Sequence, residues 1–575
     1  MIEPKKAVLG ISAYALADRS RKGKIRLDLN ENNWGCSPKV IEALRNVRAA
    51  DISVYPEYGA LTAKLSEFLG VEPDTIMTAN GSDGAIETIA ETYVDRGDEV
   101  IIPVPTFSIF EHCCRLRDAD IRKVAYTGDL SFPLRKVLDA ITGRTRMIVV
   151  VNPNSPTGTS IGEDDLAALL KAAPDSVVVL DEAYTRYTGK SHAGLTSQFP
   201  NLVALGTFSK AYGLAGLRIG YVISRRENIE SMKKVSLPFS VNAMAAAAVI
   251  AAIDDQEHVD GMIGAMKEEK KYLAGELEAL GIRTRDTEIN FILADIGRRS
   301  GAVFQKLRSR GILVRMLKEP PLDGHFRITL AGRDENARFV EAMKDIVPPE
   351  AVIFDIDGVL VDDSKSYRLA IRKTAQHFLG RELSPAVVQE YKNRGGYNDD
   401  WDLTAAIVKA EGKDAGREKI IEKFQEYYLG EDFNGLIQNE TWLLDEGVLD
   451  RLGRDFRLGV VTGRPRKEAE HVLRRFKADR YFDVIVAMED TPSGKGKPDP
   501  LGITMAMEKL GVKRAVYVGD TIDDVKAAKA AGIAAMGVAG ASGAPEEQKK
   551  LLEREGARWV VGSANEILEV LEIES

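Results

Sequence analysis

Short apolar runs recur along the chain, and polar or glycine-rich turns follow them directly. In the first half, such runs occupy residues 75–79, 100–103, 147–151 and 177–180. In the second half, they occupy residues 351–354, 458–461 and 515–518. Runs that are apolar at nearly every position are typical of strands buried in a parallel sheet. Segments with helical periodicity accompany them, at residues 38–47, 85–94, 258–280 and 334–346. The pattern predicts an α/β protein.

Pro348 and Pro349 divide this pattern into two parts. Proline fixes φ and lacks a backbone donor, so the pair ends the helix predicted at 334–346 and forms a stiff joint without a Gly/Ser-rich tether. A new apolar strand begins at Ala351. A chain of 575 residues is too long for one core and suggests roughly two to four structural domains. We therefore expect one α/β enzyme before the prolines and a second one after them.

Composition narrows the possible partners and the compartment. The chain is 44% apolar and 29% charged, and its net charge of −9 comes without a basic stripe, so we expect neither nucleic acid nor membrane as a partner. No apolar run reaches membrane-spanning length, and the first residues lack the apolar core of a signal peptide. Cys36, Cys113 and Cys114 cannot form a disulfide framework. A reducing compartment, the cytoplasm, fits this composition.

Polar residues suited to one cofactor follow the apolar strands of the first half. Glycines and Ser82 form a strand-to-helix turn of the kind that binds phosphate. Asp181 ends another strand, and Lys210 and Arg218 follow the next one. In open parallel sheets, ligands bind at such strand ends. Lysine for a Schiff base, a buried aspartate for the pyridine nitrogen and arginine for the phosphate together suit pyridoxal 5'-phosphate.

With these motifs, residues 1–347 resemble fold-type I, pyridoxal-phosphate-dependent aminotransferases, and most closely the histidinol-phosphate aminotransferases. The motifs lie at residues 29–32, 55–57, 152–158, 181–184, 209–218 and 326–329. The resemblance implies a large parallel-sheet domain at about 48–245. It also implies a small α+β domain at about 1–47 and 246–347.

The resemblance implies a role for each matching residue. Lys210 is the catalytic residue that forms the Schiff base and moves the proton, and Arg327 clamps the α-carboxylate of glutamate, with Arg315 and Tyr14 as candidates for the substrate phosphate. Tyr55 reaches the cofactor of a second subunit, which makes a homodimer necessary. The other implied cofactor-binding residues are Ser82, Asp83, Phe107, Asn154, Ser155, Asp181, Tyr184, Ser209 and Arg218. Two depart from the family pattern: Ser155 replaces an asparagine that bonds the cofactor's phenolic oxygen, and Phe107 replaces a common tyrosine. We expect a working site with a modestly retuned cofactor.

The strands of the second half end in a different set of groups. Asp355 and Asp357 project to the same side of an extended chain and would repel each other without a divalent cation. Thr462, Lys497 and a further pair, Asp520 and Asp524, follow. Together they supply a nucleophile, groups for a phosphoryl group and ligands for Mg²⁺.

This order resembles the haloacid dehalogenase-like phosphohydrolases over residues 348–575. The resemblance implies a Rossmann-like core at about 350–362 and 455–575 and a helical cap at about 363–454. Asp355 would attack phosphorus, and Asp357 would protonate the leaving group. Thr462 and Lys497 would hold the phosphoryl oxygens, with Lys495 a weaker match than Lys497. Asp355, Asp357 through its carbonyl, Asp520 and Asp524 would bind or support Mg²⁺. We interpret the loop that begins at Arg394 as substrate-selecting; an exposed turn is the alternative.

The two resemblances together suggest consecutive steps of histidine biosynthesis. Glutamate would aminate imidazole acetol phosphate, and the L-histidinol phosphate formed would be hydrolysed to L-histidinol. Two alternatives stay open. Both chemistries could act on another small phosphorylated amine, with a threonine-phosphate decarboxylase-like first domain as one variant. Otherwise one domain, such as a phosphatase-like one, is a non-catalytic docking or regulatory module.

Overall fold

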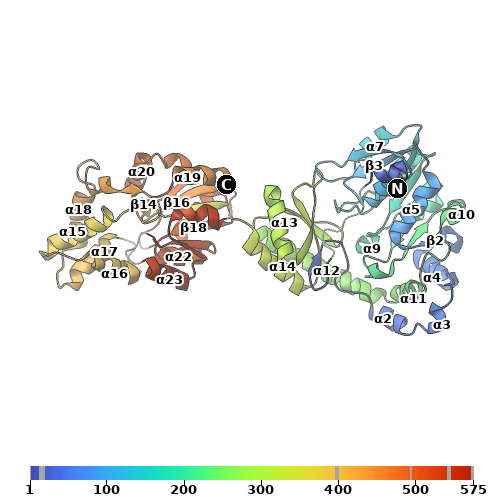
Figure 1. The fold of residues 1–575 in the computed structure, drawn as a ribbon, viewed down its shortest axis with the longest axis horizontal. Helices are drawn as coiled ribbons and strands as arrows, with labels where there is room; N and C mark the ends of the chain where they lie inside the picture. The colour runs from blue at the N-terminus through green and yellow to red at the C-terminus, as the bar shows by residue number, and fades with distance from the viewer. Residues whose placement is uncertain (1, 12–19, 395–399, 493–494, 541–544, 572–575) are drawn as a thin grey trace. The chain divides into compact units, whose positions relative to one another are not determined.

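The computed structural model describes residues 2–11, 20–394, 400–492, 495–540 and 545–571. The chain forms two compact units, Met1–Val347 and Pro348–Ser575, each built on its own sheets (Figure 1). Both units are α/β, as predicted.

The first unit contains a seven-stranded sheet in the order β2-β8-β7-β6-β5-β3-β4. Its strands are β2 (Ile76–Ala79), β3 (Glu99–Val104), β4 (Asp120–Ala125), β5 (Thr145–Val151), β6 (Val177–Asp181), β7 (Leu202–Thr207) and β8 (Gly220–Ile223). β8 runs antiparallel to both of its neighbours, and the remaining pairs are parallel. The apolar runs predicted as strands correspond to β2, β3, β5 and β6, whereas edge strand β4 is mostly exposed and lacks an apolar run.

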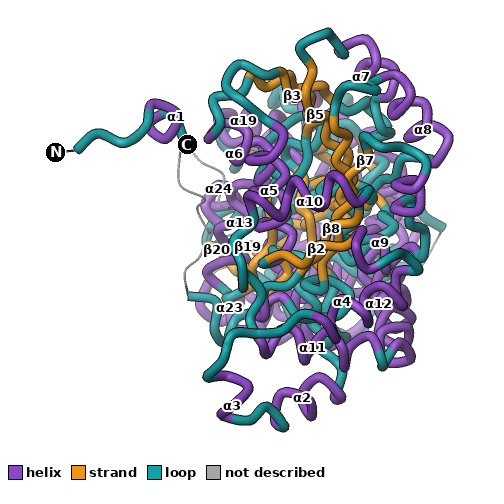
Figure 2. Tube along the Cα trace, turned by 90° about the vertical axis from the view of Figure 1, so that its right-hand side faces the viewer, coloured by secondary structure: helices purple, strands orange, loops and turns teal. Residues whose placement is uncertain are grey.

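Helices pack on both faces of this sheet. One apolar core lies under α5 (Gly81–Tyr93), α6 (Ile109–Leu116) and α10 (Arg226–Val235), and Figure 2 shows α5 and α10 in front of the strands. A second core lies under α7 (Leu134–Ala140) and α8 (Glu163–Ala172) on the opposite face. Helix α5 begins four residues before the predicted start at residue 85, because Gly81 adopts a φ of 72° that turns the chain directly from β2 into the helix.

A five-stranded sheet in the order β1-β11-β12-β10-β9 forms the smaller part of this unit. Its strands are β1 (Ile25–Leu27), β9 (Thr284–Arg285), β10 (Phe291–Asp295), β11 (Ile312–Met316) and β12 (His325–Thr329). The helices of the unit outside the large sheet are α1 (Lys6–Leu9), α2 (Pro38–Arg45), α3 (Ala49–Ile52), α4 (Gly59–Leu69), α9 (Thr185–Thr188), α11 (Ala243–Ile253), α12 (Gln256–Ala279), α13 (Ser300–Ser309) and α14 (Arg333–Ile346). Strand β1 pairs with β11, so residues near the start of the chain are held beside the last strands of the unit. Ser37 caps α2 by accepting a hydrogen bond from the backbone N–H of Lys39, as predicted.

The second unit contains a six-stranded parallel sheet in the order β17-β16-β13-β18-β19-β20. Its strands are β13 (Ala351–Phe354), β16 (Arg457–Val461), β17 (Val484–Val486), β18 (Ala515–Gly519), β19 (Ala534–Val538) and β20 (Trp559–Val561). Its helices are α19 (Glu446–Asp455), α20 (Arg466–Arg475), α21 (Leu501–Leu510), α22 (Ile522–Ala530), α23 (Pro545–Glu555) and α24 (Ile567–Val570). The central strand β13 is fully buried, as its apolar sequence predicts.

A helical insertion leaves this core after β13. Its four helices, called here the cap helices, are α15 (Tyr367–Leu379), α16 (Pro385–Arg394), α17 (Asp400–Ala410) and α18 (Arg417–Tyr428). The chain enters the insertion through β14 (Val361–Asp362) and returns through β15 (Thr441–Trp442), and these two strands pair antiparallel. The cap is therefore attached to the core by two adjacent strands.

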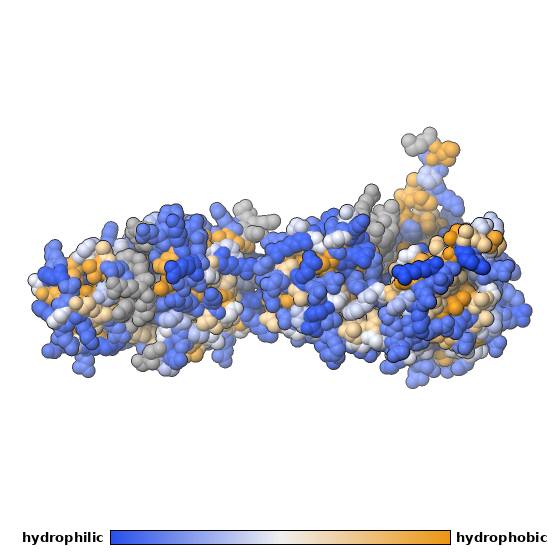
Figure 3. Space-filling view, turned by 90° about the horizontal axis from the view of Figure 1, so that it is seen from below, coloured by the Kyte–Doolittle hydropathy of each residue, from blue (hydrophilic) through white to orange (hydrophobic). Residues whose placement is uncertain are grey.

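Most of the surface visible in the space-filling view is hydrophilic, with small apolar patches (Figure 3). Among the described helices, none combines the length and the apolar character needed to cross a bilayer.

Candidate active sites

In the first unit, candidate catalytic groups meet at the carboxyl ends of the central strands. Asp181 is the last residue of β6, and Lys210 follows β7. Asp181 is buried, and its Oδ1 accepts a hydrogen bond of 2.9 Å from the backbone N–H of Ala183. Among the described residues, no lysine or arginine forms an ion pair with it. Burial raises the pKa of Asp181 to about 7, although the charge of Lys210 opposes this. A protonated pyridine nitrogen is the kind of group that such a buried carboxyl fits.

Lys210 lies beside Tyr184 in this cluster. Its Nζ donates to the backbone oxygen of Leu29 at 3.2 Å and lies 5.6 Å from the centre of the Tyr184 ring. Burial alone would raise the pKa of the Tyr184 hydroxyl, but the charges of Lys210 and Arg327 outweigh burial, and the pKa is lowered. The tyrosine is thus in an environment that favours strong hydrogen bonding through its oxygen.

Asn30 links these groups to the small sheet, and the sequence motif around it did not reveal this contact. Its Nδ2 donates to the hydroxyl of Tyr184 at 2.8 Å and lies 3.4 Å from the Oγ of Ser155. Arg327 also reaches Ser155, with Nη1 at 3.0 Å from that Oγ. Arg315 lies opposite Arg327, on the neighbouring strand β11. Ser155 is therefore held by two donors that come from distant parts of the chain.

Arg218 lies at the start of helix α5, where a phosphate would meet free backbone N–H groups. Its Nη2 donates to Asp83 at 2.7 Å, and its Nη1 lies 3.5 Å from the Oγ of Ser209. A Cβ on Gly81 would come within 2.4 Å of the guanidinium, so the glycine makes room for it. Ser82 is the second residue of α5, beside this group. The structure thus brings together the four predicted phosphate-binding residues, Ser82, Asp83, Ser209 and Arg218. The carboxylate of Asp83 forms an ion pair with the guanidinium of Arg218.

The remaining predicted residues of this unit are Asn154, Phe107, Tyr55 and Tyr14. The side chain of Asn154 is fully buried and bonds to Pro105, Thr106 and Thr157, so it holds the loop together. Phe107 is partly buried against the core under α5. Tyr55 is 74% exposed and stacks on Phe239. Tyr14 lies outside the described residues.

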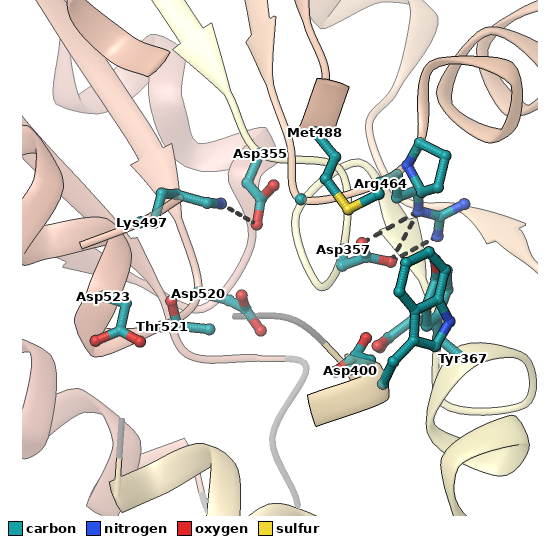
Figure 4. Close-up of a pocket in the computed structure, with 14 residues that line it drawn as sticks. Asp355, Asp357, Tyr367, Asp400, Arg464, Met488, Lys497, Asp520, Thr521 and Asp523 are labelled. Carbon is teal, nitrogen blue, oxygen red and sulfur yellow. Dashed lines mark hydrogen bonds and ion pairs between the residues drawn. The ribbon is translucent and has the colours of Figure 1, made fainter. Parts of the chain in front are cut away.

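In the second unit, the loops after β13, β16 and β18 supply one pocket, which Figure 4 shows with its lining residues. Lys497 extends into it, and its Nζ lies 2.9 Å from Oδ2 of Asp355 and 2.6 Å from Oδ1 of Asp524. Lys495 instead pairs with Asp499 and is largely exposed, so the geometry favours Lys497 over Lys495 as the buried cation of the site. Burial raises the pKa of Asp355 well above its usual range even though Lys497 opposes the shift. Among the described residues, none forms a hydrogen bond with the buried Oδ1 of Asp355, so this oxygen is available to a ligand in the pocket.

Three carboxylates of this pocket are arranged as a metal could use them. Oxygens of Asp355, Asp520 and Asp524 lie within 4.8 Å of one another. A Cβ on Gly358 would come within 2.2 Å of Asp520, so the glycine after Asp357 makes room for this carboxylate. A set made only of carboxylate oxygens fits Mg²⁺, a hard cation. Asp524 is also bonded by Thr521 and Lys497, which suits a supporting position.

Asp357 turns its carboxylate away from this group and toward Arg464, an interaction that the motif pattern did not reveal. Nε of Arg464 lies 3.2 and 3.1 Å from the two carboxylate oxygens, and Nη2 lies 2.5 Å from Oδ1 (Figure 4). The backbone carbonyl remains the route by which Asp357 would contact a metal. Thr462 is buried, and its Oγ1 accepts from the backbone N–H of Arg464 at 3.2 Å.

The cap helices complete the wall of the pocket. Tyr367 comes from α15, and Asp400 and Trp401 come from α17. The predicted substrate-selecting loop begins at Arg394, the last residue of α16, but that side chain and residues 395–399 lie outside the described part of the chain.

Comparison with protein families agrees with both sites. Residues 22–342 match the model of class I and II aminotransferases, and residues 352–538 match that of haloacid dehalogenase-like hydrolases. The chain belongs to the class I and II aminotransferases and carries a haloacid dehalogenase-like hydrolase domain after the aminotransferase domain.

Individual proteins that are similar to this chain are histidinol-phosphate aminotransferases. Histidinol-phosphate aminotransferase of Moorella thermoacetica is 39% identical over 57% of this chain and 86% of its own length. That of Symbiobacterium thermophilum is 37% identical over 56% of this chain and 90% of its own length. The crystal structure of the Sinorhizobium meliloti histidinol-phosphate aminotransferase with pyridoxal-5'-phosphate covers 60% of this chain and 98% of its own. At a TM-score of 0.57 and 24% identity, that structure supports the fold. The predicted fusion is thereby confirmed.

Proposed function

We propose that the chain is a bifunctional enzyme of histidine biosynthesis. Residues 1–347 transfer the amino group of glutamate to imidazole acetol phosphate, and residues 348–575 hydrolyse the L-histidinol phosphate formed to L-histidinol. The observation that carries the proposal is the presence of two clusters of candidate catalytic groups in one chain, Asp181 with Lys210 and Asp355 with Lys497. The relatedness of the first unit to histidinol-phosphate aminotransferases supports the choice of substrate.

In the first site, residues of the chain bind the substrates and move a proton. Pyridoxal phosphate, when bound with its ring nitrogen toward Asp181, supplies the electron sink for the carbon that loses its proton. Lys210 takes that proton and returns it one carbon further on. Arg327 binds the α-carboxylate of glutamate through its planar fork, which lysine cannot imitate.

Around this centre, hydrogen bonds set the orientation of the cofactor. Tyr184 and Ser155 would bond the phenolic oxygen of the cofactor, and Nδ2 of Asn30 lies 2.8 Å from the tyrosine oxygen. We infer that the amide of Asn30 provides a hydrogen-bond donor near the phenolic oxygen of the cofactor. The family's asparagine would donate there, and the side chain of Ser155 is shorter. Arg218, Ser209 and the N-terminus of α5 hold the phosphate.

In the second site, Asp355 and Asp357 have different catalytic roles. Mg²⁺, when bound by Asp355, Asp520 and the carbonyl of Asp357 with Asp524 in support, neutralises charge on the phosphoryl oxygens. Asp355 attacks phosphorus and forms an aspartyl-phosphate, while Asp357 gives a proton to the leaving alkoxide. Asp357 then takes a proton from the water that hydrolyses the aspartyl-phosphate. Lys497 and Thr462 hold the phosphoryl group.

We further propose that the enzyme is a cytoplasmic homodimer. Large apolar side chains are exposed on or beside α2, α3 and α11 of the first unit: Ile41, Ile52, Val54, Leu237, Phe239 and Met244. Burying such a surface against a second copy is favourable, at roughly 25 cal/mol per Å². Tyr55 lies among these residues, which suits a side chain that completes the partner's cofactor site.

The test is a coupled assay with glutamate and imidazole acetol phosphate. We expect 2-oxoglutarate to appear first and inorganic phosphate to follow, with Mg²⁺ needed only for phosphate. Formation of 2-oxoglutarate without any phosphate release from L-histidinol phosphate would refute the second activity and leave the first. Turnover of other phosphorylated ketones with imidazole acetol phosphate inactive would refute the substrate.

A further inference from the structure

Arg464 is an almost fully buried arginine in the wall of the phosphatase pocket. It lies between β16 and α20, two residues beyond Thr462, and its side chain is 1% exposed. Its guanidinium bonds two carboxylates that come from different parts of the second unit. Asp357 follows the central strand β13, whereas Glu440 immediately precedes β15, where the chain returns from the cap helices.

All three guanidinium nitrogens of Arg464 donate hydrogen bonds. Nε and Nη2 face Asp357 at 2.5 to 3.2 Å. Nη2 also donates to Oε1 of Glu440 at 2.9 Å, and Nη1 donates to Oε2 of Glu440 at 3.1 Å and to the hydroxyl of Tyr428 at 3.0 Å. Paired planar contacts of this kind fix the direction of each carboxylate as well as its charge.

The Glu440 side of this arrangement belongs to the attachment of the cap. Glu440 accepts hydrogen bonds of 2.9 Å from Tyr428, at the end of α18, and from Ser366, just before α15. The ring of Tyr367, the first residue of α15, lies 5.1 Å from the guanidinium carbon. The arginine therefore joins Asp357 to residues at both crossings between core and cap.

Neither carboxylate can move independently of the other in this arrangement. One buried guanidinium serves both. The side chains of Arg464 and Glu440 are 1% and 0% exposed, so separating these two would leave buried charges without their partner. A shift of the cap that moved Glu440 would draw Arg464 with it and change the direction in which Asp357 presents its carboxylate. The leaving group must approach that carboxylate to within hydrogen-bond reach for proton transfer.

We propose that Arg464 is a positioning residue that aims the Asp357 carboxylate at the leaving-group oxygen and, through Glu440, makes that aim depend on the position of the cap. This rests on the proposed phosphatase function. It predicts a defect in the step in which Asp357 gives its proton, and this is the step that differs between esters with different leaving groups.

The experiment compares two phosphate esters in the full-length Mg²⁺-loaded protein. The alkoxide of L-histidinol phosphate needs a proton to leave, whereas p-nitrophenolate leaves well without one. In Arg464→Gln we expect kcat/KM for L-histidinol phosphate to fall about 10²–10³-fold, which lies within the range of general acid catalysis. The kcat/KM for p-nitrophenyl phosphate should fall less than about tenfold, because this ratio covers only the steps up to departure of the leaving group, and p-nitrophenolate needs little help from Asp357.

Arg475→Gln is the matched control. Arg475 donates to the backbone oxygens of Ile437 and Gln438, close to Glu440, but does not contact Asp357. Any loss from loosening this segment should affect both esters equally. Glu440→Gln keeps a side chain of the same shape beside Arg464, and we expect the same selective loss as in Arg464→Gln, but smaller.

The outcomes separate the inference from the proposed function. Equal losses on both esters, or none, in Arg464→Gln would overturn the positioning role. If that variant does not fold, as judged by thermal unfolding, Glu440→Gln decides by the same ratio. Failure of the wild-type protein to hydrolyse either ester would refute the phosphatase function itself.

Discussion

Replacing Asp181 by asparagine should remove a pH dependence of stability from the cofactor-free protein. Burial raises the pKa of this carboxyl from an ordinary value of 3.8 to about 7. Between these two values the unfolded chain has released the proton and the folded chain still holds it, so stability falls as pH rises. The slope approaches 1.4 kcal/mol per pH unit. Partial ionisation of the folded state near pH 7 reduces the total, and about 2 kcal/mol should be lost between pH 5 and 7.

The measurement is urea unfolding of the two cofactor-free proteins at pH 5 and pH 7. The difference in free energy of unfolding between wild type and Asp181→Asn isolates this carboxyl, because contributions from other groups, including those of the second unit, cancel. Relative to Asp181→Asn, the wild type should lose about 2 kcal/mol of its free energy of unfolding between pH 5 and pH 7. Added pyridoxal phosphate should reverse the shift in wild type by placing a positive ring nitrogen beside the carboxylate. A difference that stays constant from pH 5 to pH 7 would refute the conclusion that Asp181 is buried without a cation.

Three further predictions concern the independence and the charges of the two sites. Lys210→Ala should abolish transamination and spare phosphate release, Asp355→Asn should do the reverse, and loss of both activities from either change would contradict separate sites. Chelation of Mg²⁺ should stop phosphate release from L-histidinol phosphate while 2-oxoglutarate formation continues; equal inhibition of both would count against a metal confined to the second site. Lys497→Met should destabilise the second unit by about 3–5 kcal/mol, because it leaves the carboxylates of Asp355 and Asp524 buried without their common cation, and thermal unfolding should show it. An unchanged transition would contradict this account.

Much of the fold could be predicted because buried parallel strands have a distinctive apolar sequence. The same pattern located candidate residues, since a polar residue directly after such a strand lies at the edge where ligands bind. Asp181 and Asp355 follow this rule. Edge strand β4 has no such apolar sequence. Most of its side chains are exposed and can be polar, so the pattern of apolar positions does not reveal the strand.

The contacts of Asn30 and Arg464 could not be predicted in the same way. Asn30 reaches Tyr184 across 154 positions, and Arg464 reaches Asp357 across 107. Such pairs depend on how the small sheet or the cap packs against the main sheet, which local periodicity does not encode. Their residue types also gave little signal, since isolated asparagines and arginines are mostly found on surfaces. The burial of Arg464 became informative only with its partners in place.

Both sites contain buried carboxyl groups that the protein's own cations only partly neutralise, and this would suit the two different cofactors proposed for the chain. In the first unit, the buried carboxyl of Asp181 has a raised pKa, and a protonated ring nitrogen would complete it. In the second, the carboxylates of Asp355 and Asp524 share Lys497, and Arg368 lies 3.6 Å from the neighbouring carboxylate of Asp520. The pKa of Asp355 stays raised despite that lysine, so a nucleophile that must be ionised needs further positive charge. A divalent cation would supply it and would also offset the charge of a phosphate ester bound in the pocket.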